Sequence, residues 1–121
     1  MLKVMLIEDD KTMLSLLSTL LKMEGFQVVQ LTTEQTVADL IASLHREKPD
    51  LTLVDVHLQN ASGIDLVTNL RKDPDFDTLR ILMTSGLDTS DECKQAGAND
   101  FILKPYMPDE LIQRIRRVLK N

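Results

Sequence analysis

Three consecutive carboxylates follow an apolar run near the start of the chain. Residues 4–7 are all apolar, and Glu8, Asp9 and Asp10 come directly after them. Like charges crowded at the end of a buried segment cost free energy unless a cation or a proton compensates them. A divalent metal ion is the simplest compensator, because carboxylate oxygens are the hard ligands that Mg²⁺ prefers.

Further reactive side chains follow three later apolar runs. Asp55 follows the run 51–54, Ser85 follows 81–83, and Lys104 follows 101–103. A carboxylate is already ionised, so Asp55 can attack phosphorus without a general base. Lys104 and Ser85 can then bind the oxygens of a phosphoryl group. No cluster of histidines or cysteines with the spacing of a zinc site is seen in the sequence.

The elements that must position these side chains are predicted from hydrophobic periodicity. Near-continuous apolar runs at 4–7, 28–31, 51–54, 81–83 and 101–103 predict strands buried on both faces. Between them lie amphipathic patterns with apolar residues three and four positions apart, typical of helices. Their stripes are Met13, Leu17, Leu20 and Leu21; Val37, Leu40, Ile41 and Leu44; Ile64, Val67 and Leu70; and Leu111, Ile112, Ile115, Val118 and Leu119.

Helix boundaries are predicted from capping residues. The segment Asp88 to Ala96 has few large apolar residues, so it predicts a short or irregular fourth helix. The proposed boundary residues are Asp10 as a first N-cap, Gly25 as a stop, a capping box at Thr32 and Gln35, Ser62 as a third N-cap, and Pro108 at the start of the last helix.

Strand and helix alternate five times, which predicts an α/β fold with a doubly wound, five-stranded parallel sheet between two helical layers. Residues 1–121 are expected to form one domain without a separate output domain. Ligands of such folds bind at the carboxyl ends of the strands. Each polar residue there could be a cap or a surface side chain, but one shared site explains all four strand ends.

Composition excludes several function classes. The 121 residues are 43% hydrophobic and 27% charged, and the formal net charge of -5 argues against direct DNA binding. No apolar stretch approaches the roughly 20 residues of a membrane span. Cys93 is the only cysteine, so an internal disulfide is impossible and a cytoplasmic location is expected.

The strand-end motifs resemble those of the receiver domains of two-component response regulators, which have the flavodoxin-like receiver fold. The resemblance covers nearly the whole chain and is carried by Glu8-Asp9, Asp55, Ser85-Gly86 and Lys104-Pro105, with turns at Ser62-Gly63 and Ala96-Gly97-Ala98. It departs from the family in the short interval between Ser85 and Gly97, and in a serine where threonine is more frequent.

The resemblance implies a metal site and a phosphorylation site. Asp55 would be phosphorylated, and Mg²⁺ or Mn²⁺ would be bound by Asp9, Asp55 and the main-chain carbonyl of His57. Glu8 would act on the metal through water. The side chain of His57 would face solvent.

The resemblance also implies a switch. Ser85 and Lys104 would bind the phosphoryl group, Phe101 would be an aromatic rotamer switch, and Gly86 would leave access to the site. The Lys104–Pro105 peptide bond would be cis.

The function implied is a phosphoacceptor switch, not an enzyme. Its partners would be a sensor histidine kinase or a histidine phosphotransfer protein, and a downstream target that binds the face from the fourth to the fifth helix. Asp100, Glu110 and Arg114 resemble charges used for dimer contacts, which leaves a homodimer open. A magnesium-dependent phosphatase with an aspartyl-phosphate intermediate and a flavodoxin-like cofactor binder are the alternatives. The latter is disfavoured, because carboxylates after the first strand repel phosphate.

Overall fold

The computed structural model of the chain describes residues 1–31 and 36–120. Strands and helices alternate as the hydrophobic pattern predicts. The strands are β1 (Lys3–Ile7), β2 (Gln27–Gln30), β3 (Leu51–Asp55), β4 (Arg80–Ser85) and β5 (Asp100–Leu103). The helices are α1 (Lys11–Met23), α2 (Val37–Glu47), α3 (Gly63–Arg71), α4 (Ser90–Ala96) and α5 (Pro108–Lys120), and a short 3₁₀ helix, η1 (Pro74–Phe76), precedes β4.

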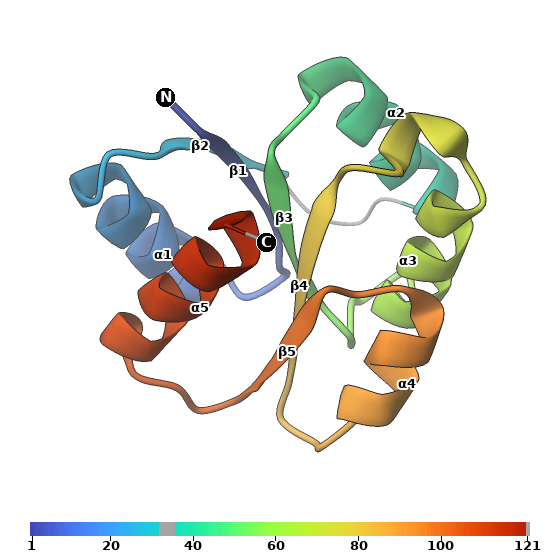
Figure 1. The fold of residues 1–121 in the computed structure, drawn as a ribbon. Helices are drawn as coiled ribbons and strands as arrows, with labels where there is room; N and C mark the ends of the chain where they lie inside the picture. Colours follow the sequence, from blue (N-terminus) through green and yellow to red (C-terminus); the bar gives the residue numbers. More distant parts are fainter. Residues whose placement is uncertain (32–35, 121) are drawn as a thin grey trace.

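The five strands form one parallel sheet in the order β2-β1-β3-β4-β5. Helices α1 and α5 cover one face of this sheet, and α2, α3 and α4 cover the other (Figure 1). Two hydrophobic clusters fill the spaces between the layers. Alternate residues of β1 belong to opposite clusters, with Met5 and Ile7 in one and Val4 and Leu6 in the other. The predicted doubly wound, three-layer fold is therefore confirmed.

Capping side chains begin the helices where the sequence predicts. Asp10 accepts a hydrogen bond from the N–H of Met13 at 3.1 Å, and Ser62 accepts one from the N–H of Asp65 at 3.3 Å. Helix α5 begins at Pro108, and Gly25, with φ of +92°, follows the end of α1. These four boundaries are confirmed.

The capping box predicted at residues 32 and 35 lies outside the described residues. In the described part of this region, Thr36 and Asp39 form a reciprocal capping box at the start of α2.

The two edge strands differ from the prediction. In β2, Val28 and Val29 are only half-buried, and in β5, Leu103 is 48% exposed. An edge strand has a neighbour on one side only, so its side chains are less completely covered by the helices. The prediction of burial on both faces was therefore wrong for β2 and for the end of β5. It holds for the central strands β1, β3 and β4.

Helix α4 is short, as predicted, with seven residues. The side chain of its N-cap residue, Thr89, accepts no capping hydrogen bond from a backbone N–H of the helix. Across the described ranges, no helix is both long enough and apolar enough to span a membrane.

Candidate functional site

Four strands deliver the predicted site residues to one edge of the sheet. Glu8 follows β1, Asp55 ends β3, Ser85 ends β4 and Lys104 follows β5. These strands are consecutive neighbours and all run in the same direction, so their carboxyl ends meet. The backbone topology thus brings together residues that are up to 96 positions apart in the sequence.

Lys104 joins two of the carboxylates. Its ammonium nitrogen lies 2.7 Å from Oε1 of Glu8 and 2.9 Å from Oδ2 of Asp55. Glu8 is 7% exposed and Asp55 is 9% exposed, whereas the lysine side chain is 23% exposed. Two nearly buried carboxylates therefore share a single ammonium group.

This arrangement shifts the pKa values of the two carboxylates in opposite directions. Burial raises the pKa of Glu8 to about 7, the neighbouring Asp55 acts in the same direction, and Lys104 opposes both. Burial also acts to raise the pKa of Asp55, but hydrogen bonds with Glu8, Lys104 and the N–H of His57 together lower it. Asp55 is consequently the carboxylate that stays ionised at neutral pH, as a nucleophile requires.

The backbone beyond β3 holds the Asp55 carboxylate in place. The N–H of His57 donates a hydrogen bond to Oδ1 of Asp55 at 3.0 Å, and His57 pairs with Ser62 in an isolated antiparallel bridge. The side chain of His57 is exposed. A Cβ atom on Gly63 would stand 2.3 Å from the carbonyl oxygen of Asp55, so only glycine allows α3 to begin this close to the site.

The carboxylate of Asp9 contacts the backbone that follows β3. Its Oδ2 accepts a hydrogen bond from the N–H of Gln59, and its own N–H donates to Oε2 of Glu8 at 3.0 Å. Glu8, Asp9 and Asp55 do not place one ligand oxygen each within 4.8 Å of the others. Within the described residues, the trio that meets this spacing is His45, Asp73 and Asp75. The sequence offered no signal for that trio beyond the short spacing of its two aspartates.

Ser85 and Gly86 lie at the β4–β5 side of the edge, whereas Phe101 is the second residue of β5 and pairs with Met83. Ser85 is fully buried, and its Oγ accepts a hydrogen bond from the N–H of Leu87 at 3.1 Å. A Cβ on Gly86 would have no atom within 4 Å, so this position leaves open space. Phe101 is 8% exposed and packs in the core beneath α4.

Tyr106 is a neighbour that the sequence analysis did not single out. The peptide bond between Lys104 and Pro105 is cis, and Tyr106 follows it. The hydroxyl of Tyr106 donates to Sδ of Met13 at 3.8 Å, and burial raises the pKa of this phenol to about 12. The signal that could have found Tyr106 is its place two residues after Lys104.

Comparison with known proteins identifies the family and the fold. Residues 4–116 match the family model of the response regulator receiver domain. A putative response regulator from Chloroflexus aurantiacus superposes with a TM-score of 0.88 at 29% identity, covering 98% of each chain. The BeF3-activated N-terminal receiver domain of Klebsiella pneumoniae RstA superposes with a TM-score of 0.85 at 30% identity, covering 98% of this chain and 99% of that one.

Curated relatives are longer proteins. The transcriptional regulatory protein CpxR of Escherichia coli is 34% identical, with 98% of this chain covering 50% of CpxR. The probable transcriptional regulator ycf27 of Guillardia theta is 32% identical, and 46% of it is covered. The chain thus spans about half the length of these relatives. With the family matched over nearly all of its residues, the chain belongs to the response regulator receiver domains of two-component signal transduction.

Proposed function

We propose that this receiver domain is a phosphoacceptor switch in which Asp55 receives a phosphoryl group from a phosphohistidine. The observation that carries the proposal is the position of Asp55 at the carboxyl edge of the sheet. Its carboxylate is held by the ammonium of Lys104 and the N–H of His57, and its lowered pKa keeps it ionised.

The transfer is a single displacement at phosphorus. An oxygen of Asp55 forms a bond to phosphorus while the bond from phosphorus to the donor imidazole nitrogen breaks. The bonding electron pair leaves with the imidazole, and the product is an acyl phosphate on Asp55. The ammonium of Lys104 is 2.9 Å from the attacking carboxylate and can neutralise a phosphoryl oxygen.

The residues of this edge fit Mg²⁺ or Mn²⁺. Glu8 and Asp55 are buried carboxylates that share the ammonium of Lys104, so two negative charges face one positive charge at this edge. Asp9, Asp55 and the main-chain carbonyl of His57 would hold the ion, and Glu8 would act through water. All of these are the hard oxygen donors that such ions prefer. When bound, the ion supplies positive charge that stabilises the transferring phosphoryl group.

The switch itself rests on Ser85 and Phe101. A new acyl phosphate adds acceptor oxygens and negative charge beside a buried hydroxyl. Ser85 would exchange its bond from Leu87 for one to the phosphoryl group, and the ring of Phe101 would follow into the space that Ser85 leaves. The surface from α4 to α5 would then change its preference for a downstream target.

The proposed partners are named by protein type only. A sensor histidine kinase or a histidine phosphotransfer protein would be the phosphodonor, and the location would be cytoplasmic. CpxR is named a transcriptional regulatory protein, and other relatives are named DNA-binding response regulators. Since this chain matches about half of their length and its net charge is -5, we do not assign it DNA binding.

The test is stoichiometric labelling by a small phosphodonor. Incubation with acetyl phosphate and Mg²⁺ should add about one phosphoryl group per chain, as measured by intact-mass spectrometry. Asp55→Asn should abolish the adduct, whereas Asp65→Asn, an exposed aspartate on α3, should label like the natural sequence. Omission of the metal should lower the labelling rate.

Two outcomes would overturn this proposal. One is labelling that survives Asp55→Asn. The other is sustained hydrolysis of p-nitrophenyl phosphate over many turnovers, which would favour the magnesium-dependent phosphatase instead. That enzyme needs a second acid that protonates the leaving group. The acid usually stands two positions after the nucleophile, and this chain has His57 there.

A further inference from the structure

A second group of potential ligands lies away from the edge that carries Glu8, Asp55, Ser85 and Lys104, which is called the phosphoacceptor edge below. Nε2 of His45, near the end of α2, is 3.1 Å from Oδ2 of Asp73, and its Nδ1 is 3.9 Å from Oδ2 of Asp75. One ligand atom from each residue lies within 4.8 Å of the other two. We propose that His45, Asp73 and Asp75 form a cation site that takes Zn²⁺ or a metal ion of similar ligand preference.

Two of the three side chains are already oriented by other contacts. The ring of His45 packs against the ring of Phe76, with 4.5 Å between centroids and a 47° tilt. Oδ1 of Asp73 caps η1 by accepting the N–H of Asp75 at 2.9 Å, which leaves Oδ2 directed at the imidazole. Ordered donors lose less entropy on binding an ion than free side chains do.

The spacing suits a small tetrahedral ion. Bonds of 2.0–2.2 Å to nitrogen and oxygen place neighbouring ligand atoms about 3.3 Å apart around Zn²⁺. Oδ2 of Asp73 lies 3.1 Å from Nε2 of His45, close to this separation, whereas Oδ2 of Asp75 lies 3.9 Å from the other ring nitrogen, Nδ1. The side chain of Asp75 is 76% exposed, so it can rotate to close the remaining gap. Water would supply further ligands.

The local charge favours a cation. Two carboxylates face one imidazole, and Asp50 and Lys48 in the adjoining pocket add one charge of each sign. The carboxyl end of a helix carries partial negative charge, and His45 lies in the last turn of α2. An imidazole nitrogen with carboxylate oxygens selects zinc and similar first-row ions, whereas Mg²⁺ prefers oxygen alone.

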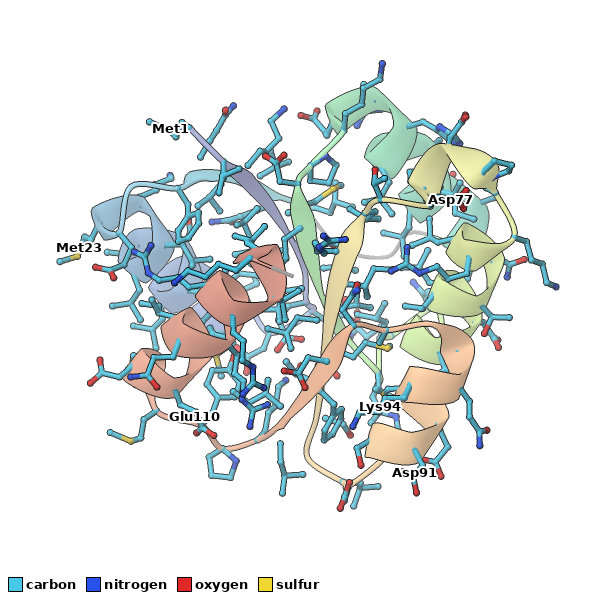
Figure 2. The ribbon with its side chains drawn as sticks, in the orientation of Figure 1. Met1, Met23, Asp77, Asp91, Lys94 and Glu110 are labelled. Atoms are coloured by element: carbon cyan, nitrogen blue, oxygen red, sulfur yellow. The ribbon has the colours of Figure 1, made fainter. Side chains whose placement is uncertain are left out.

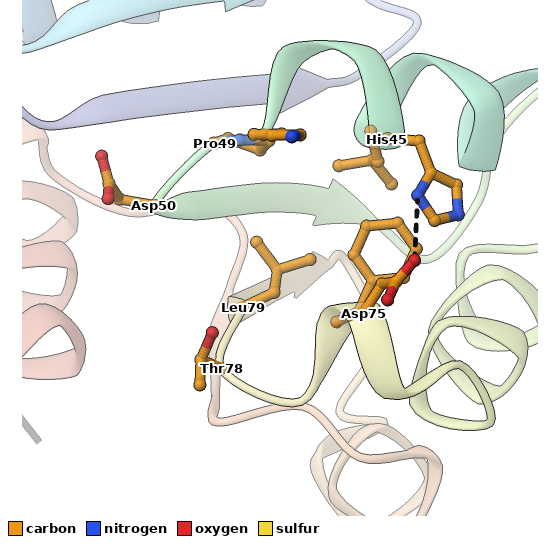
Figure 3. A pocket seen from close by; sticks show the side chains of 9 residues that line it. His45, Pro49, Asp50, Asp75, Thr78 and Leu79 are labelled. Carbon is orange, nitrogen blue, oxygen red and sulfur yellow. Dashed lines mark ion pairs between the residues drawn. The ribbon is translucent and has the colours of Figure 1, made fainter.

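The site is separate from the phosphoacceptor edge. His45 and Asp75 face each other at a pocket of about 530 Å³, and Pro49, Asp50 and Leu79 also line it (Figure 3). Asp50 immediately precedes β3, whereas Asp55 ends it. Since a strand rises about 3.3 Å per residue, roughly 16 Å of chain separates Asp50, at the pocket, from Asp55.

Titration of the natural chain with ZnCl₂ in an isothermal calorimeter tests the proposal. It should show saturable binding, and His45→Gln should weaken that binding at least about tenfold, because loss of even an outer-shell partner costs 10- to 100-fold. Asp75→Asn should weaken it in the same direction. Asp77→Asn is the matched control, because it removes the same charge from the C-cap residue of η1, which Figure 2 labels, and Asp77 does not belong to the trio. Its affinity should be unchanged.

Amide NMR distinguishes this site from the phosphoacceptor edge. Zn²⁺ should shift the resonances of His45 and of residues 73–76, and these shifts should be absent in His45→Gln. Circular dichroism checks that each variant is folded. The proposal is overturned if Zn²⁺ does not bind saturably, if His45→Gln binds as the natural chain does, or if only residues beside Asp9 and Asp55 shift.

Discussion

Lys104 contacts both Glu8 and Asp55, so at the scale of single residues its ammonium is central to the proposed phosphoacceptor site. The two carboxylates are nearly buried, and removing their shared cation leaves their charge without this partner. It also removes a donor for the oxygens of an incoming phosphoryl group.

Lys104→Met should therefore slow labelling by acetyl phosphate about 10²-fold, because the loss of one preorganised donor typically has that effect on a charged transition state. The rate is measured by intact-mass spectrometry at saturating Mg²⁺. Lys72→Met, at the exposed end of α3, removes the same charge and should leave the rate unchanged. A Lys104→Met rate within twofold of the natural chain would show that the ammonium is dispensable.

Asp100 is a second residue whose charge state matters. Its Oδ2 lies 2.5 Å from Arg117, and Arg114 donates to the carbonyl of Phe101 at 2.6 Å, so these two of the three arginines of α5 contact β5. Burial acts to raise the pKa of Asp100, but hydrogen bonds from Arg117 and the N–H of Phe101, with the charge of Arg114, lower it. The dimer contacts suggested for Asp100 and Arg114 would therefore compete with bonds inside the chain, whereas Glu110 is exposed (Figure 2).

Asp100→Asn should reduce the free energy of unfolding by about 1.5–3 kcal/mol at pH 7, the range for hydrogen bonds to charged groups. A pKa that is lower in the folded state means that the unfolded chain binds more protons, so this contribution is complete above the unfolded pKa. It is lost as pH falls through the folded pKa. Urea unfolding of the natural chain and of Asp100→Asn should show a difference in unfolding free energy that becomes smaller below about pH 4. If this difference in unfolding free energy is constant from pH 7 to pH 3, it does not come from the ionised carboxylate of Asp100.

At the scale of elements, the start of α3 sets the position of Asp55. Ser62 caps the helix, and Gly63 places its first turn against the carbonyl oxygen of Asp55. The added Cβ of any other residue would stand 2.3 Å from that oxygen and 2.9 Å from Cα of Val56, both backbone atoms that cannot rotate away.

Gly63→Ala should cost about 1–3 kcal/mol of unfolding free energy through overpacking. It should also slow phosphoryl labelling, because the shift that relieves the clash moves Asp55. Gly86→Ala is the matched control for stability, since its Cβ would have no atom within 4 Å. Thermal unfolding and labelling rates measure both effects. Equal stability of the two variants would mean that α3 moves without cost.

At the scale of the whole molecule, Arg71 joins elements that are distant in sequence. From the end of α3 its guanidinium donates to the carbonyls of Phe76, Leu79 and Gly97 and to the side chain of Asn99, at 2.7–3.0 Å. It thus links η1, the approach to β4 and the turn before β5. Gly97 is also restricted, since a Cβ there would stand 2.4 Å from Cγ of Arg71.

Arg71→Lys should lower the unfolding free energy by about 2–4 kcal/mol, because an ammonium cannot reproduce the planar fork and leaves carbonyls without donors. The midpoint of urea unfolding, with its slope, measures the loss. Arg46→Lys is the control, because it makes the same substitution at an exposed position near the end of α2 that has none of these contacts. A loss below about 0.5 kcal/mol, the usual range for surface substitutions, would exclude Arg71 as a global link.

The agreement between sequence and structure differs by feature. Strands β1, β3 and β4 were predictable because central strands are covered on both sides, which produces continuous apolar runs. The exposure of Val28 and Leu103 was not, because pairing order decides which strands lie at the edges. In α1 the predicted stripe omitted Leu14, which is 5% exposed, while Leu20 is only half-buried. Periodicity thus found the helix, but the exact angle at which it packs comes from its neighbours.

The sequence by itself determined the alternation of strands and helices, the caps at Asp10 and Ser62, and the convergence of Asp55 and Lys104. These depend on local propensity and on the parallel direction of neighbouring strands. Only the tertiary structure decided that Lys104 bridges Glu8 and Asp55, that Asp9 turns to the N–H of Gln59, and that His45 meets Asp73. These contacts join residues 28 to 96 positions apart and depend on how their side chains are oriented. Hydrophobic periodicity reports local structure and does not determine such orientations.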